Sequence, residues 1–264
     1  MPHEKIKVAL AGAYGRMGKA ILECLHQNNT FVLTAATTSA ASPSVGKIVA
    51  PNVMLSDCAE SLFPPSDVVI DFSLPHALFA HLDLAVQYQK PMVLGTTGLG
   101  PQHHLHLQQA SKHIPVLYAP NMSIGITLIK KIASTLTQAL GPEYDVELSE
   151  THHRYKVDAP SGTSLMLGET IAQTRGVNLN QVAKFERYGT IGPRQKGEIG
   201  FSVQRGGHNL CEHTIKFLGD EESIEITHRG NSRAVYAKGA LAAAAWIVDK
   251  KAGLYKMEDV LNLP

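Results

Sequence analysis

The stretch VALAGAYGRMGKAI, residues 8–21, decides how the N-terminal part of this chain folds. It places Gly12, Gly15 and Gly18 between a short apolar run at residues 6–11 and an amphipathic segment, in the order strand, turn, helix. Glycine permits a tight turn and lets the backbone approach a pyrophosphate, whose charge meets N–H groups at the helix N-terminus. The pattern predicts a dinucleotide-binding turn, and the alternative is a glycine-rich turn without a ligand.

Four further apolar runs follow this first strand, at residues 31–37, 67–73, 91–97 and 115–121, and helical segments separate them. None of these runs alternates with polar residues, which is typical of parallel strands buried on both faces. The sequence therefore predicts an α/β fold whose first domain is a Rossmann-like doubly wound parallel sheet.

The pattern changes after about residue 123. An amphipathic helix and a strand-like segment lead into alternating runs, the first at residues 184–190, which are separated by Gly-containing turns. These runs predict a smaller α+β domain with a mostly antiparallel sheet. An alanine-rich helix near the C-terminus is expected to return to the first domain. We predict a dinucleotide-binding domain at residues 1–123, completed by 233–264, and a substrate-binding domain at 124–232.

The composition excludes several classes of function. Lysine and arginine number 24 against 23 acidic residues, so no net field favours nucleic acid. The three cysteines are far apart and suit a reducing compartment. The longest apolar run, residues 239–248, is too short to span a membrane, and the N-terminal segment lacks the features of a signal peptide. We expect a cytoplasmic protein with neither a nucleic-acid nor a membrane partner.

The end of the second strand bears on which dinucleotide binds. A carboxylate commonly accepts a hydrogen bond from the ribose 2′-hydroxyl there, but this chain has Thr38 and Ser39. Arg16 and Lys47 are candidates to attract a 2′-phosphate. The sequence favours NADPH over NADH and leaves dual use open.

The fourth and fifth predicted strands end in small-residue segments, GTTG at residues 95–98 and APNMS at 119–123. In an open α/β sheet these ends form the ligand crevice, so a nicotinamide ring could lie against them. Ordinary strand-to-helix turns are the alternative.

The stretch ELSETHHRYKVDAPSGTSL, residues 147–165, predicts an anion site. Ser161 is a plausible N-cap, after which Gly162 and Thr163 would offer backbone N–H groups at the positive end of a helix. Arg154 and Lys156 lie just upstream. The combination favours a small carboxylate, with a capped helix after a charged loop as the alternative.

Two adjacent histidines, His152 and His153, stand near Glu147 and Glu150. Neighbouring residues on a strand point to opposite faces, so this pair is poorly suited to share a metal ion, and we expect no metal site. Histidine does supply protons near neutral pH, which makes the pair candidates for acid–base work.

The chain closely resembles the 4-hydroxy-tetrahydrodipicolinate reductase (dihydrodipicolinate reductase) family over nearly its whole length. The segments that carry the resemblance are VALAGAYGRMG, DFSLP, GTTG, APNMSIG, ETHHRYKVDAPSGT, GEIGF, CEHTIKF and EITHRGNSRAVYAKGA. It implies hydride transfer from NAD(P)H to a cyclic, imine-bearing dicarboxylate after loss of water, in diaminopimelate and lysine biosynthesis. It also implies a homotetramer assembled through the second domain.

The resemblance assigns roles to individual residues. His152 would be the proton donor or acceptor and Lys156 a second proton donor, while His153, Gly162 and Thr163 would bind a substrate carboxylate. The positions that match the family's cofactor site are Gly12, Ala13, Tyr14, Gly15, Arg16, Met17, Gly95, Thr96, Thr97, Ala119, Pro120, Asn121 and Met122. We add Thr38 to the expected cofactor contacts because it ends the second strand.

Three departures from the family pattern stand out. Thr38 and Ser39 replace a pair that is acidic or basic in many members, Leu74 replaces a common arginine, and His208 replaces a more usual aspartate.

Two alternative functions are another NAD(P)-dependent reductase, such as an amino-acid dehydrogenase, and a non-catalytic dinucleotide sensor. A semialdehyde dehydrogenase is disfavoured because no cysteine occupies a plausible nucleophile turn. Proton donors such as His152 and Lys156 count against a sensor.

Overall fold

The computed structural model describes residues 4–263. The first three residues of the N-terminal segment and the final residue of the predicted 233–264 completion lie outside this range. The chain divides into two compact units, one formed by residues 1–124 and 233–264 and the other by residues 125–232. Each unit is described by itself.

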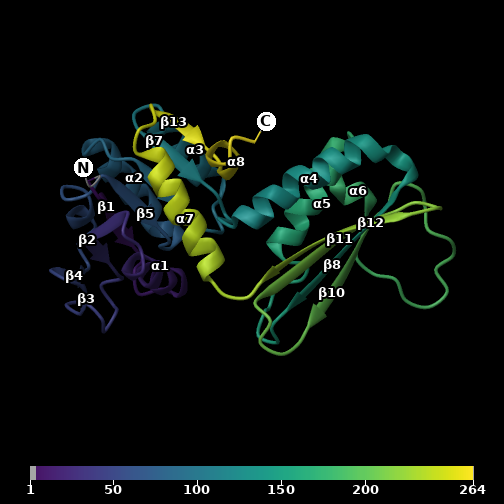
Figure 1. The fold of residues 1–264 in the computed structure, drawn as a ribbon, viewed down its shortest axis with the longest axis horizontal. Helices are drawn as coiled ribbons and strands as arrows, with labels where there is room; N and C mark the ends of the chain where they lie inside the picture. Colours follow the sequence, from purple (N-terminus) through teal and green to yellow (C-terminus); the bar gives the residue numbers. More distant parts are fainter. Residues whose placement is uncertain (1–3, 264) are drawn as a thin grey trace. The chain divides into compact units, whose positions relative to one another are not determined.

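The first unit carries an eight-stranded sheet (Figure 1). Its elements in chain order are β1 (Ile6–Ala11), α1 (Arg16–His26), β2 (Phe31–Thr37), β3 (Ile48–Ala50), β4 (Val53–Ser56), η1 (Ala59–Leu62), β5 (Val68–Asp71), η2 (Pro75–Ala77), α2 (Leu78–Gln87), β6 (Met92–Leu94), α3 (Pro101–Ala110), β7 (Pro115–Tyr118), α7 (Ala234–Ile247), β13 (Gly253–Tyr255) and α8 (Met257–Val260).

The strands of this sheet run in the order β13-β7-β6-β5-β1-β2-β4-β3. Every pairing is parallel except the one between β3 and β4. The chain moves outward from β1 to one side and then returns to β5 on the other side. The topological switch point therefore lies between β1 and β5, the place where such sheets bind ligands.

Helices cover both faces of the sheet, as the predicted doubly wound fold requires. Side chains of α1 and α7 share one hydrophobic cluster with alternate strand residues such as Val8 and Leu10. Side chains of α2 and α3 share another with the intervening residues Ala9 and Ala11. The alanines of α7 permit close packing, and at Gly239 a Cβ atom would overlap the Met122 carbonyl.

The second unit combines a helical layer with a five-stranded sheet (Figure 1). Its elements are α4 (Ile124–Leu140), which begins at the last residue of the first unit, η3 (Gly141–Glu143), β8 (Asp145–His152), α5 (Gly162–Thr174), α6 (Leu179–Val182), β9 (Ala183–Lys184), β10 (Ile199–Arg205), β11 (Cys211–Leu218) and β12 (Ser223–Gly230). Side chains from α4, α5 and the sheet form one core, which includes Ala133, Leu167 and Ile215.

The second sheet is mixed. β11 pairs antiparallel with β8 and β12, whereas β10 pairs parallel with β8 and β9. The predicted strand at residues 184–190 is wrong beyond Lys184, since the next residues form no strand. The aromatic side chains of that run, Phe185 and Tyr188, are both open to solvent, so they do not mark the buried face of a strand.

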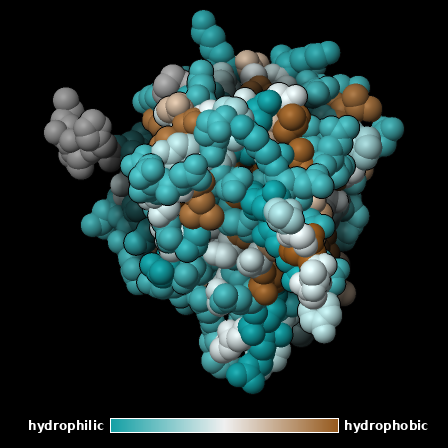
Figure 2. All heavy atoms as spheres, turned by 90° about the vertical axis from the view of Figure 1, so that its right-hand side faces the viewer, coloured by the Kyte–Doolittle hydropathy of each residue, from teal (hydrophilic) through white to brown (hydrophobic). Residues whose placement is uncertain are grey.

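The molecular surface is largely hydrophilic on the face shown in Figure 2, where hydrophobic residues form small separate groups. Scattered exposure of this kind is ordinary on protein surfaces. Among residues 4–263, no helix has the length and apolar character needed to cross a bilayer.

Candidate active site

A cavity of about 610 Å³ lies in the first unit at the switch point of the sheet. Its walls come from the turn after β1, the end of β2 and the segment after β5. The lining residues are Gly12, Tyr14, Gly15, Thr37, Thr38, Ser39, Ala40, Ser42, Asp57, Ala59, Phe72, Ser73, Leu74, His76, Ala77 and His81. The cavity has a volume ordinary for a ligand site.

Glycines create the close approach that a dinucleotide needs. Gly12 adopts a φ of +73°, which favours glycine, and a Cβ there would lie 2.8 Å from the Phe72 carbonyl oxygen. Gly18 packs so closely that a Cβ would overlap the backbone of Gly12 and Ala13. These residues fit a nicotinamide dinucleotide, whose pyrophosphate would meet the first turn of α1.

The structure brings Gly12, Tyr14, Gly15 and Thr38 together around the cavity. Buried Ala13 donates its N–H to the Thr37 carbonyl at 2.8 Å and so joins the turn to β2. Arg16 and Met17 begin α1 instead of lining the cavity.

The segments predicted to hold the nicotinamide follow the next two strands along the same sheet edge. Gly95 donates to the Asp71 carbonyl at 2.9 Å, and Ala119 donates to the Leu94 carbonyl at 3.1 Å. Gly95 lies under the Phe72 ring, where a Cβ would overlap ring atoms. The remaining residues of these segments are exposed Thr97 and Pro120, half-buried Asn121, and buried Thr96 and Met122. Of all these, only Phe72 lines the described cavity.

A buried contact between a carboxylate and an imidazole fixes the segment after β5. Asp71 is fully buried, and its Oδ2 lies 2.7 Å from His81 Nδ1 while its Oδ1 accepts from the Ser73 N–H at 2.7 Å. Burial raises the pKa of Asp71, but the His81 contact and the Ser73 hydrogen bond outweigh it and leave that pKa lowered. Leu74, which replaces a more usual arginine, is exposed on the cavity wall.

Two lysines flank the aromatic wall of the cavity. Lys19 Nζ lies 4.3 Å and Lys47 Nζ 5.3 Å from the centroid of the Tyr14 ring. A hydrogen bond with Ser44 and the charge of Lys47 lower the pKa of Tyr14. Asp57 also lines the cavity, a carboxylate that the sequence pattern missed because it follows β4 and not β2.

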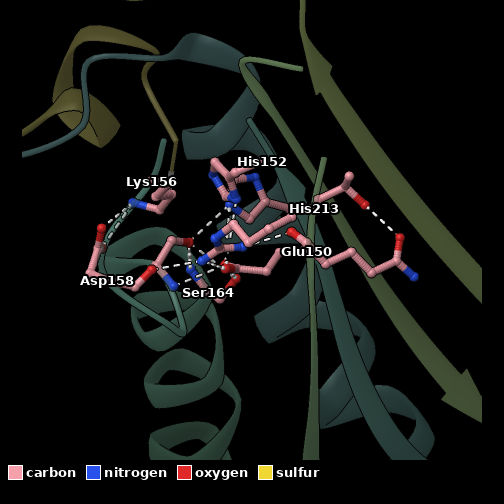
Figure 3. Close-up of polar contacts among 10 residues, drawn as sticks. Glu150, His152, Lys156, Asp158, Ser164 and His213 are labelled. Carbon is pink, nitrogen blue, oxygen red and sulfur yellow. Dashed lines mark hydrogen bonds and ion pairs between the residues drawn. The ribbon is translucent and has the colours of Figure 1, made fainter. Parts of the chain in front are cut away.

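The second unit carries a polar network centred on Glu150 (Figure 3). β8 alternates strictly, so Glu150 and His152 are both buried on one face of the sheet. Glu150 Oε2 accepts from the Ser161 N–H at 2.9 Å and from Ser164 Oγ at 2.5 Å, and Oε1 accepts from Arg205 Nη2 at 2.9 Å. Sequence reasoning considered Glu150 only as a metal ligand, because its charged partner Arg205 lies 55 residues further along the chain.

The pKa values of the two buried histidines in this network are both lowered. Burial lowers the pKa of His152, and Glu150 partly opposes this effect. Burial likewise lowers the pKa of His213 to about 4, so His213 is uncharged at physiological pH. The rings of His152 and His213 meet edge to face, with centroids 5.1 Å apart.

The predicted residues Lys156, Gly162 and Thr163 lie in the loop and helix that follow β8 along the chain. Lys156 Nζ donates to both carboxylate oxygens of Asp158, at 2.7 and 2.8 Å. Gly162 and Thr163 form the first turn of α5, which Ser161 caps by accepting from the Ser164 N–H at 3.2 Å.

Three aromatic rings lie on the residues that follow β8 and β10. The ring of exposed Tyr155 lies 6.2 Å from that of His153 and 6.5 Å from that of His208. His208, a departure from the family pattern, thus faces the same tyrosine as the predicted carboxylate ligand His153.

Side chains that could ligate a metal occur in two overlapping groups. Ligand atoms of Glu150, His152 and His213 lie within 4.8 Å of one another, as do those of Cys211, His213 and His228. Arg205 already neutralises Glu150 in the first group. The second group has zinc-type donors, but the part of the chain that the structure describes supplies only three, one fewer than a structural zinc site requires.

The Glu150 network is expected to make the free energy of unfolding depend on pH in the acid range. Burial raises the pKa of Glu150, but hydrogen bonds with Ser161, Ser164 and Arg205 outweigh burial and lower that pKa from its usual 4.5 to about 2. A depressed folded-state pKa stabilises the protein above pH 4.5, by about 3 kcal/mol for this shift, and the gain is lost as pH falls toward 2. Urea unfolding followed by circular dichroism should therefore show wild type and Glu150→Gln far apart at pH 7 and converging near pH 2. A constant gap would contradict the expectation.

Known proteins match both units. Residues 6–122 match the family model described as "Dihydrodipicolinate reductase, N-terminus", and residues 125–261 match "Dihydrodipicolinate reductase, C-terminus". The 4-hydroxy-tetrahydrodipicolinate reductase of Magnetococcus marinus is 43% identical over 97% of this chain and 98% of its own. That of Nitrosospira multiformis is 40% identical over 98% of each chain.

Solved structures support the same fold. The dipicolinate-bound dihydrodipicolinate reductase of Paenisporosarcina sp. TG-14 superposes with a TM-score of 0.79 at 24% identity, covering 97% of this chain and 99% of that one. The amine dehydrogenase of Mycobacterium smegmatis gives 0.65 at 10% identity, covering 99% and 97%. Matches over both units, with identities near 40% along almost the whole length, show that this chain belongs to the dihydrodipicolinate reductase family of oxidoreductases.

Proposed function

We propose that this protein reduces 4-hydroxy-tetrahydrodipicolinate to tetrahydrodipicolinate, with loss of water, in diaminopimelate and lysine biosynthesis. The observation that carries the proposal is the arrangement of the second unit. Two candidate proton donors, His152 and Lys156, belong to the strand and loop that lead directly to the N-terminus of α5. A small dicarboxylate suits this combination of cationic and N–H donors.

The reduction needs a hydride and a proton. When bound, reduced nicotinamide supplies the hydride, to the substrate ring carbon at C4. Gly162, Thr163 and His153 bind a substrate carboxylate, and Lys156 adds a positive charge. His152 or Lys156 then donates the proton. The residues contribute by positioning the substrate and neutralising its charge.

The test is a coupled assay. Pyruvate and aspartate semialdehyde are joined by the preceding synthase, and the loss of reduced-nicotinamide absorbance is followed with NADPH and NADH in parallel. We expect oxidation that depends on the synthase. Folded protein that binds cofactor but oxidises neither would point to another substrate or to a sensor.

We further propose that NADPH is the preferred cofactor. Lys47 and Lys19 flank Tyr14 on the cavity wall, and Thr38 and Ser39 end β2 without a carboxylate. Asp57 in the same wall could accept from a ribose 2′-hydroxyl, which leaves NADH usable.

Replacing Lys47 by alanine is expected to raise KM for NADPH about tenfold, because a charged hydrogen bond to phosphate contributes roughly 1.5 kcal/mol or more. KM for NADH should stay within about twofold by the same reasoning. Lys250→Ala is the matched control, since Lys250 lies 4.4 Å over the Trp246 ring in the same unit but outside the cavity. Equal weakening of both cofactors would argue against a 2′-phosphate contact.

The family resemblance also supports a cytoplasmic homotetramer that assembles through the second unit. Light scattering at several protein concentrations tests the oligomeric state.

A further inference from the structure

A single buried carboxylate connects the candidate proton donor to the turn that would bind substrate. Glu150 is 2% exposed, and its three hydrogen-bond donors come from the backbone of Ser161, the hydroxyl of Ser164 and the guanidinium of Arg205. Ser161 and Ser164 bracket the first turn of α5, which carries Gly162 and Thr163. The network therefore fixes Glu150 as an anion in one place.

Strand register places three other polar side chains on the same face as this anion. Glu150 and His152 are two residues apart on β8, His213 of β11 pairs with Glu150, and Arg205 of β10 pairs with His152. Paired residues of neighbouring strands project to the same side of a sheet. The backbone ladder itself thus sets the distances within the group.

In His152, a ring nitrogen that has no hydrogen-bond partner among the described residues faces a carboxylate. Its Nδ1 atom is buried and lies 3.7 Å from Glu150 Oε1. That separation exceeds a hydrogen bond, but catalytic contacts are often long in ligand-free proteins and tighten in the complex. His213 meets His152 through an edge-to-face ring contact, and its Nε2 lies 3.2 Å from Ser161 Oγ.

We propose that Glu150 is the positioning residue for His152: its carboxylate orients the imidazole and keeps a proton on Nδ1, which leaves Nε2 to exchange a proton with the substrate. The proposal rests on the proposed function and deepens it. When Nε2 gives up its proton, the proton that remains on Nδ1 faces Glu150. The same carboxylate holds the first turn of α5, so the proton donor and the carboxylate-binding turn share one anchor.

The charges that face His152 come from every element around it. Glu150 of β8 and Asp158 of the following loop favour its protonated form, whereas Lys156 of that loop and Arg205 of β10 disfavour it. The ring of His213 on β11 packs against it. Removing the Glu150 charge leaves two cations against one exposed anion, so the pKa of His152 falls further.

The first experiment uses the unmodified full-length protein. With 15N-histidine labelling and assignment through His152→Gln, the ring nitrogen shifts of His152 report its tautomer above its pKa. We expect the proton on Nδ1. A proton on Nε2 with bare Nδ1 would overturn the proposal. This measurement needs neither substrate nor turnover, so it remains informative if the coupled assay fails and the proposed function is abandoned.

The second experiment compares variants. In Glu150→Gln we expect kcat to fall roughly 10- to 100-fold, less than the loss of an acid–base group itself would cost, because Glu150 acts through His152. Both the His152 titration and the alkaline limb of the kcat profile should move to lower pH. KM should change far less than kcat. The matched control, Glu225→Gln, removes a carboxylate of the same sheet that pairs with Lys216 at 2.8 Å, and should change neither.

Ser164→Ala separates positioning from stability. It removes the hydroxyl contact with Glu150 and leaves the carboxylate charge in place. We expect a lower melting temperature with the His152 titration unchanged. If Glu150→Gln lowers kcat but leaves the His152 titration unchanged, its effect is the one expected of Ser164→Ala, a loss of support for the helix. Glu150 would then not position His152, and the proposal would be wrong.

Discussion

Replacing Lys156 by alanine is expected to lower kcat about 100-fold or more, the contribution of a positioned proton donor, while the Kd for NADPH stays within about twofold. The cofactor cavity belongs wholly to the first unit, whereas Lys156 and its partner Asp158 belong to the second. Loss of the amine removes the proposed proton donor and its positive charge, and it changes none of the residues that line the cavity. Steady-state kinetics gives kcat, and fluorescence titration of NADPH gives Kd.

Lys196→Ala is the matched control for this prediction. Lys196 lies in the same unit and pairs with Glu143 at 2.7 Å, but it is far more exposed than Lys156. It should leave both quantities unchanged. Weakened NADPH affinity with intact turnover in Lys156→Ala would refute the assignment of Lys156 as a donor.

Replacing Gly18 by alanine is expected to disrupt both stability and cofactor binding. The added Cβ would overlap backbone atoms of Gly12 and Ala13, and backbone cannot yield as a flexible side-chain end can. The turn between β1 and α1 must then open, at a cost of about 3 kcal/mol. The melting temperature should fall by roughly 6–12 °C, and the Kd for NADPH should rise at least about tenfold because the N–H groups that meet the pyrophosphate move.

Gly206→Ala supplies the comparison. Nothing lies within 4 Å of a Cβ built at Gly206, and its φ is not in the left-handed region. Differential scanning calorimetry should find this variant close to wild type. Normal stability and affinity in Gly18→Ala would show that the turn is looser than the structure implies.

The first unit could be predicted because its signals are local. The apolar run at residues 6–11 and the run at 31–37 are confirmed as β1 and β2 with the same bounds. β3, β4 and β13 were missed because they lie toward the two ends of the sheet and are only partly buried. They therefore lack the continuous apolar run that marks the equally short β5, β6 and β7.

The site could be predicted only in part. His152, Lys156 and the Ser161 cap lie within one segment, and a contiguous motif points to them. Glu150 binds Arg205 across 55 residues, and Ser161 contacts His213 across 52. Such partners depend on the parallel register of β10 and the antiparallel register of β11, which no local pattern encodes.

The discontinuous first unit has a consequence for synthesis on the ribosome. When residue 124 has been made, β1 and its neighbours have one face that α1 alone covers, because α7 begins at Ala234. The second unit, residues 125–232, is complete before α7 exists. The nascent chain thus completes the second unit first and the first unit last. A translation product truncated before α7 would keep the whole second unit and expose one apolar face of the first sheet to chaperones and proteases.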